Sequence, residues 1–133
     1  MSDSILDRYA ASVRTGGAPV EHEGAEDFAA FGWLRGPAAR VLMLELRKKD
    51  GTVRAFGYAW LNEVLYDPSA GITLCFTGQK VKIIGRNLDA ELRPNVRLFR
   101  GLLRHRVIFV AEADQFAAMA AADGETLVER IEW

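Results

Sequence analysis

The chain has 133 residues, a formal net charge of −1 and a single cysteine, Cys75. This length favours one domain whose core folds without metal or disulfide staples, and one cysteine excludes an intrachain disulfide framework. The first residues lack a signal-peptide pattern, and no apolar run is long enough to cross a membrane. We therefore expect a cytoplasmic protein that does not associate with membranes.

Charge is distributed unevenly along the chain. Residues 35–106 hold 14 of the 17 Lys and Arg but only six of the 18 Asp and Glu. Such asymmetry indicates either an anionic partner or acidic ends that fold back over a basic middle.

The first quarter of the chain is predicted to hold two short helices joined by a linker. Residues 1–24 read as a short amphipathic helix and a Gly- and Pro-containing linker, loosely attached to a single domain over residues 25–133. A second helix is predicted over residues 25–36, because acidic residues precede apolar residues at helical spacing.

From Arg40 onward the apolar residues recur at every second position, which predicts strands. Asp50-Gly51 between two alternating runs is a strong hairpin signal. The second strand should run from Thr52 towards Leu65, with a bulge or bend at Asn62. Further turns and alternating runs extend the pattern to four consecutive antiparallel strands, a meander that ends near residue 85.

The last third of the sequence predicts two helices and two strands. A helix rich in arginine should begin at Pro94, which suits a first helical position, after a short turn over residues 88–92. Residues 107–110 predict a strand buried at the centre of a sheet. Residues 114–123 predict a short helix, and residues 125–133 a final strand.

These elements predict an α+β fold: a curled antiparallel meander, or a partly open small barrel, with helices packed on one side. We expect about five or six strands in its sheet. The predicted core consists of Leu42, Leu44, Leu46, Ile72, Leu74, Phe76, Val81, Ile83, Phe99, Leu103, Ile108 and Val110.

A stripe of arginines is the most informative feature for function. Its members recur at steps of four, three and four, so on one helix they would share a narrow solvent-facing side. Like charges at these spacings cost a few tenths of a kcal/mol, so something else should compensate them. The stripe consists of Arg93, Arg97, Arg100 and Arg104, and Lys80, Lys82 and Arg86 just upstream could widen it.

Three compensations remain open for this basic stripe. They are the phosphates of a nucleic acid, the acidic ends of the same chain, and the acidic face of another copy. The stripe has no aromatic residues on which single-stranded bases could stack. We therefore expect a non-enzymatic interaction or scaffold module that self-associates and docks acidic protein surface. The alternative is an accessory nucleic-acid-binding protein that uses the same residues.

No catalytic residue, metal site or cofactor is predicted. His22 lies between two glutamates in the linker and is interpreted as a solvated loop residue. His105 is expected to cap the arginine helix, and Cys75 to be a small buried residue in a strand. The sequence has no glycine-rich phosphate-binding loop.

Overall fold

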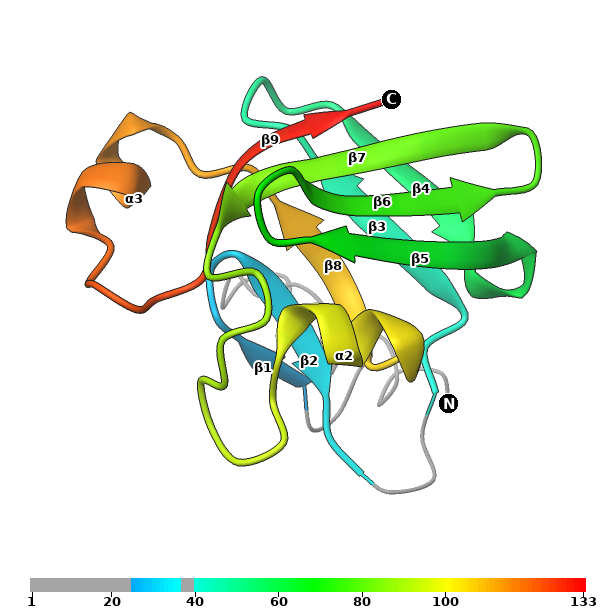
Figure 1. Cartoon of the computed structure of the whole chain (residues 1–133), viewed down its shortest axis with the longest axis horizontal. Coiled ribbons are helices and arrows are strands. Elements are labelled where there is room, and N and C mark those ends of the chain that lie inside the picture. The colour runs from blue at the N-terminus through cyan, green and yellow to red at the C-terminus, as the bar shows by residue number, and fades with distance from the viewer. Residues whose placement is uncertain (1–24, 37–39) are drawn as a thin grey trace, which may run out of the picture.

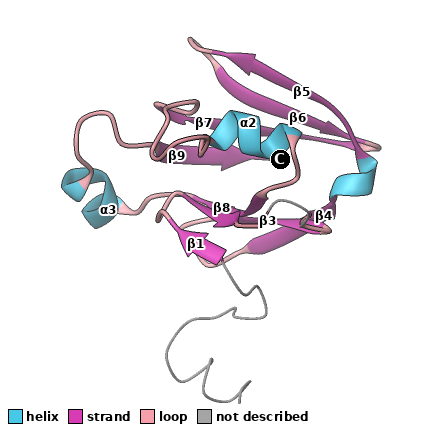
Figure 2. Ribbon diagram, turned by 90° about the horizontal axis from the view of Figure 1, so that it is seen from below, coloured by secondary structure: helices cyan, strands magenta, loops and turns pink. Residues whose placement is uncertain are grey.

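The computed structural model describes residues 25–36 and 40–133, so the helix and linker predicted over residues 1–24 lie outside the described residues. The described part is mostly β, with two sheets and a few short helices, which fits the α+β class. Figures 1 and 2 show the two sheets as separate layers. Buried side chains from both sheets form one continuous core between them.

The first sheet has five strands in the order β1-β2-β8-β3-β4, antiparallel except for the parallel pair β3–β8. Its strands are β1 (Ala25–Asp27), β2 (Phe31–Leu34), β3 (Met43–Arg47), β4 (Val53–Gly57) and β8 (Val107–Ala111). The second sheet has four antiparallel strands in the order β5-β6-β7-β9. Its strands are β5 (Leu61–Asp67), β6 (Gly71–Phe76), β7 (Gln79–Arg86) and β9 (Leu127–Glu132).

The helix predicted over residues 25–36 is wrong, because this segment forms the β1–β2 hairpin. The Asp27 side chain accepts a hydrogen bond from the backbone N–H of Ala29, whose φ of 67° belongs to a turn. All four residues of β2 are buried, since the strand lies between β1 and β8. A short, fully apolar run has the same appearance in a buried strand and in a helix, so its periodicity was misleading.

The turns of the predicted meander are confirmed, but its strands do not form one continuous sheet. The Asp50-Gly51 hairpin joins β3 and β4, and the register shifts between Leu61 and Glu63, which confirms the bulge at Asn62. Between β4 and β5, however, the 3₁₀ helix η1 (Tyr58–Trp60) carries the chain from the first sheet into the second. The buried strand expected over residues 107–110 is confirmed as β8.

The predicted core residues are buried with three exceptions. Leu42 is 83% exposed, because it lies before β3, which begins at Met43, and so outside the strand in which buried and exposed side chains alternate. Leu103 is half exposed and Phe99 is only partly buried. Both belong to α2 (Leu98–Leu103), a helix of six residues. This helix turns a different face to the core, with Leu98, Gly101 and Leu102 buried.

The helices differ in how they meet the sheets. α2 contacts β5 of the second sheet and β8 of the first, beside the space between the two layers. The short helix predicted near residue 114 is confirmed as α3 (Gln115–Ala120), which lies at the periphery in Figure 1. Asp114 caps it by accepting a hydrogen bond from the N–H of Ala117. The strand expected at the C-terminal end is confirmed as β9.

Glu112, directly after β8, ties the two sheets together. Its carboxylate accepts the N–H of Lys49 at 2.9 Å, in the β3–β4 hairpin. The same carboxylate accepts the N–H of Ile131 at 2.6 Å, on β9. One side chain thus connects the hairpin of the first sheet with an edge strand of the second.

Candidate anion-binding site

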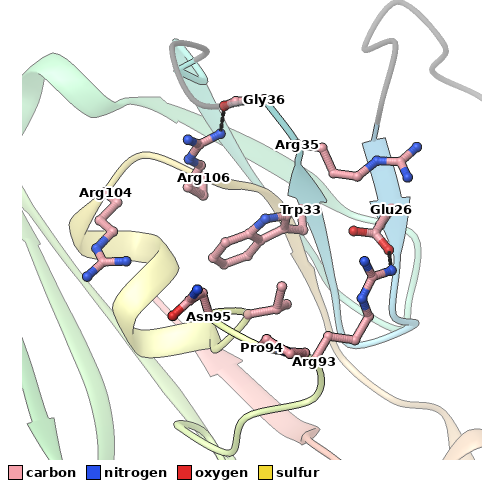
Figure 3. Close-up of a pocket in the computed structure, with 10 residues that line it drawn as sticks. Glu26, Trp33, Arg35, Gly36, Arg93, Pro94, Asn95, Arg104 and Arg106 are labelled. Carbon is pink, nitrogen blue, oxygen red and sulfur yellow. Dashed lines mark hydrogen bonds and ion pairs between the residues drawn. The ribbon is translucent and has the colours of Figure 1, made fainter.

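A solvent-open pocket of about 290 Å³ lies where the β1–β2 hairpin meets the turn before α2 and the end of that helix. Among the described residues, four arginines and one glutamate line it, which gives these side chains a formal charge of +3. Figure 3 shows these side chains around the indole of Trp33. The lining residues are Glu26, Trp33, Arg35, Gly36, Arg93, Pro94, Asn95, Val96, Arg104 and Arg106.

A tight turn places Arg93 at this pocket. Arg93 and Val96 form an isolated bridge, and Asn95 has a φ of 67°. Proline followed by asparagine is a combination typical of turns, because proline fixes its own φ and asparagine tolerates a positive one. The predicted helix start at Pro94 is therefore wrong, and α2 begins at Leu98.

The four arginines of the stripe therefore do not share one helix face: Arg93 and Arg104 line the pocket, and Arg97 and Arg100 lie elsewhere. Arg93 and Arg97 precede the helix, Arg100 lies within it and Arg104 follows it. Arg93 forms an ion pair with Glu26 on β1 and lines the pocket. Arg104 also lines the pocket, and it forms no ion pair with any residue in 25–36 or 40–133.

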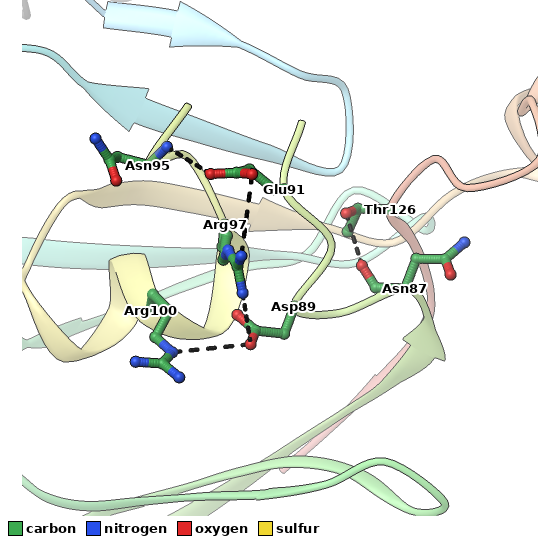
Figure 4. A network of polar contacts seen from close by, with 7 residues as sticks. All are labelled: Asn87, Asp89, Glu91, Asn95, Arg97, Arg100 and Thr126. Carbon is green, nitrogen blue, oxygen red and sulfur yellow. Dashed lines mark hydrogen bonds and ion pairs between the residues drawn. The ribbon is translucent and has the colours of Figure 1, made fainter. Parts of the chain in front are cut away.

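Arg97 and Arg100 belong to a separate polar network, shown in Figure 4. They approach the Oδ2 atom of Asp89 at 3.7 and 3.8 Å, and Arg97 also approaches Glu91 at 4.0 Å. Glu91 in turn accepts the backbone N–H of Asn95. The network joins the segment before α2 to the helix, so these two arginines have structural partners within the chain.

The three upstream basic residues lie away from the pocket. Lys80 and Lys82 alternate with the buried Val81 and Ile83 on β7, so they are on the outer face of the second sheet. Arg86, at the end of β7, approaches Glu129 at 3.8 Å. None of the three lines the pocket.

Two pocket arginines did not attract notice in the sequence. Arg35 follows β2 directly and Arg106 precedes β8 directly, and these strands are antiparallel neighbours. Arg106 uses Nη1 to donate hydrogen bonds to the carbonyl oxygens of Leu34 and Gly36. The antiparallel pairing of β2 with β8 places both arginines at the same end of the sheet.

Trp33 forms the floor of the pocket and is only 7% exposed. A Cβ atom at Gly101 would lie 2.4 Å from its ring, so the absence of a side chain there lets α2 pack directly on the indole. The floor of the pocket is therefore part of the core, while the turn over residues 93–96 forms part of its rim.

The histidine and the cysteine within the described residues lie outside the pocket. His105 has a φ of 58°, and its ring stacks on Tyr58 with 4.4 Å between centroids. Burial, with a smaller effect of the Arg40 charge, lowers the pKa of His105, so the neutral ring is favoured. Its backbone ends α2 as expected, since its N–H approaches the carbonyl of Leu102 at 3.5 Å, whereas its ring stacks on Tyr58 and does not bond the last carbonyls. Cys75 is half buried on β6, opposite Lys80.

Tyr58, on which the His105 ring stacks, is buried and hydrogen-bonded. Its hydroxyl donates a 2.7 Å hydrogen bond to the carbonyl of Val107, and burial raises the pKa of this phenol.

Within the described ranges, no three His, Cys, Asp or Glu residues gather as a metal site would require, and no helix is long and apolar enough to span a membrane. His22 lies outside the described residues.

Comparison with known proteins gives no further guidance to the site. No protein-family model, curated protein or solved structure matches the chain. The chemistry of the pocket therefore has to be inferred from its own residues.

Proposed function

We propose that the protein is a non-enzymatic interaction module that docks an anionic group of a partner protein in the arginine-lined pocket. The observation that supports this is the concentration of four guanidinium groups around one pocket, with a single carboxylate among the lining residues that the structure describes. Guanidinium groups bind carboxylates and phosphates through paired, charge-assisted hydrogen bonds.

The shape of the pocket favours a macromolecular partner. Its volume of about 290 Å³ lies just below the range of roughly 300–1,000 Å³ for small-molecule sites, and it is open to solvent. An anionic side chain on a protein surface needs only such a shallow site. The pocket floor is also nearly closed by the buried Trp33, which leaves little aromatic surface for stacking nucleic-acid bases.

This function predicts binding of an acidic peptide that depends on Arg104. A labelled peptide of six Asp and Glu residues should bind the wild-type protein and weaken with rising salt, because the attraction is between exposed charges. Arg104→Glu should weaken binding at least about tenfold, equivalent to ~1.4 kcal/mol. Fluorescence anisotropy at low and physiological salt measures both effects.

The matched control for this experiment is Arg130→Glu. Arg130 lies on β9 and pairs with Glu132, outside the pocket, so the control has the same change in net charge. Equal losses in both variants would contradict a pocket and indicate only a general charge effect. Tighter binding of single-stranded DNA or RNA than of the peptide would favour the nucleic-acid alternative.

We include self-association in the proposal because exposed apolar side chains gather where β4 passes into β5. A Cβ atom on Gly57 would lie 3.1 Å from Trp60 and 3.6 Å from Met43, so these two exposed side chains are neighbours. In addition, β4 and β5 are edge strands of their sheets. Edge strands and apolar patches are surfaces that subunits commonly cover.

Self-association through this patch predicts a dimer or larger oligomer that Trp60 supports. Light scattering after size exclusion should give a mass above that of one chain for the wild type, decreasing with dilution. Trp60→Ser should move the protein towards the monomer, because it removes the largest exposed ring of the patch. Phe116→Ser, on the exposed α3, is the control and should leave the mass unchanged. A monomeric wild-type protein would remove self-association from the proposal.

A further inference from the structure

We propose that the anionic group that fits the pocket is a phosphate monoester on a side chain of the partner protein. This inference rests on the proposed function and names the chemistry of the docked group. It follows from the balance of charge in the pocket, from the orientation of one arginine and from the apolar wall beside it.

The positive charges in the pocket are only partly compensated. Arg93 is paired with Glu26, so this couple is close to neutral. Arg106 bonds neutral carbonyl oxygens, so its charge is retained. Arg104 has no ion-pair partner among residues 25–36 and 40–133. Even when Arg35 is left out of the count, two positive charges remain, which calls for a dianion.

Arg106 is oriented in advance for such a group. Both of its hydrogen bonds use Nη1, and they hold the guanidinium against the end of β2. A guanidinium has five N–H donors, so most of its donors remain for a ligand. Because the side chain is already fixed, binding costs less conformational entropy than ordering a free arginine would.

The arrangement of the side chains separates a charged side from an apolar wall. In Figure 3 the guanidinium of Arg106 lies above the Trp33 ring toward Gly36, that of Arg104 lies to the left of the ring and points away from Arg106, and the Arg93–Glu26 pair lies to the right. Pro94 and Val96 also line the pocket. The carbon atoms of a phosphorylated side chain could lie along these apolar surfaces while its phosphate bonds the fixed guanidinium of Arg106 and the exposed side chain of Arg104 turns toward it.

A phosphate monoester fits this charge better than the other common anions. It carries about −1.5 to −2 at pH 7 and presents three acceptor oxygens, which suits two guanidinium groups. A carboxylate or a phosphodiester carries a single negative charge and would leave one arginine uncompensated. The pocket should therefore discriminate between a phosphorylated residue and its acidic analogues.

The experiment compares one peptide with phosphoserine, aspartate or serine at its centre and neutral residues elsewhere, titrated at constant ionic strength. We expect the phosphopeptide to bind at least about tenfold more tightly than the aspartate peptide. Its affinity should decrease as the pH falls through about 6, where the monoester gains its second proton. Arg104→Gln should remove most of this preference, whereas Arg130→Gln should retain it.

Each outcome decides a different part of the proposal. Equal affinity for the phosphoserine and aspartate peptides would overturn the phosphate inference and leave acidic docking intact. No binding of either, together with no binding of the six-residue acidic peptide, would overturn the proposed function as well. Inorganic phosphate binding as tightly as the phosphopeptide would assign the site to free phosphate and overturn the role of a protein partner.

Discussion

Replacing Gly71 by alanine should lower the free energy of unfolding by about 3–5 kcal/mol. Gly71 begins β6 with a φ of 113°, a conformation that residues with side chains rarely adopt. A Cβ atom there would also lie 2.2 Å from the carbonyl oxygen of Ile83. That oxygen belongs to the neighbouring strand β7, so the clash can be relieved only by moving the sheet.

The control for this prediction is Gly78→Ala, at the turn between β6 and β7. Gly78 has a φ of 83°, but no described residue has an atom within 4 Å of the position that its Cβ would take. The same substitution should cost only the backbone strain there, about 1–2 kcal/mol. Urea unfolding of both variants measures the difference. Equal losses of stability would contradict the close approach of Gly71 to β7.

The parts of the fold that follow from local chemistry were predictable from the sequence. Asp50-Gly51 specifies a hairpin by its turn preferences alone, and the strict alternation of residues 72–76 identifies the buried face of β6. The switch between sheets at η1 has no such local signal. Nothing in residues 58–60 distinguishes a chain that continues a meander from one that enters a second sheet.

The helix assignments failed where local patterns were compatible with two structures. The apolar residues in and before β2 recur at a spacing that a helix would also have, although the segment is a buried strand. Pro94 suits the first position of a helix and also the second position of a turn, and Asn95 favours the turn. In the turn, Arg93 forms an ion pair with Glu26, which is 67 residues earlier in the chain. A local sequence pattern cannot reveal such a distant contact.

The candidate site shows the same limit. Charge asymmetry and the spacing of the stripe single out Arg93 and Arg104, which line the pocket, and their role there stays a prediction. Their grouping with Arg35 and Arg106 depends on the pairing of β2 with β8, which brings together residues far apart in the chain. The compensation by the acidic ends of the chain is found only for Arg93, which pairs with Glu26. Arg97 and Arg100 pair instead with Asp89, in the segment just before the helix, which was not among the three compensations considered.

A second large effect is expected for Phe31→Ala, which should lower the free energy of unfolding by about 3–5 kcal/mol. Phe31 is fully buried, with 0% exposure, and its ring lies 5.3 Å from Phe28 and 6.5 Å from Trp33 between centroids. Truncation leaves a cavity in the centre of the core that the rigid β2–β8 pairing cannot fill. Chemical denaturation measures the loss.

The control, Phe116→Ala, removes the same atoms from a side chain that is 81% exposed, so stability should change by less than about 0.5 kcal/mol. The two variants also separate fold from function. Because Phe31 supports Trp33, its truncation should weaken acidic-peptide binding even at temperatures where the variant is folded, whereas Phe116→Ala should bind normally. Unchanged binding in a folded Phe31→Ala protein would mean that the indole floor does not contribute to the site, and that the arginines alone hold the ligand.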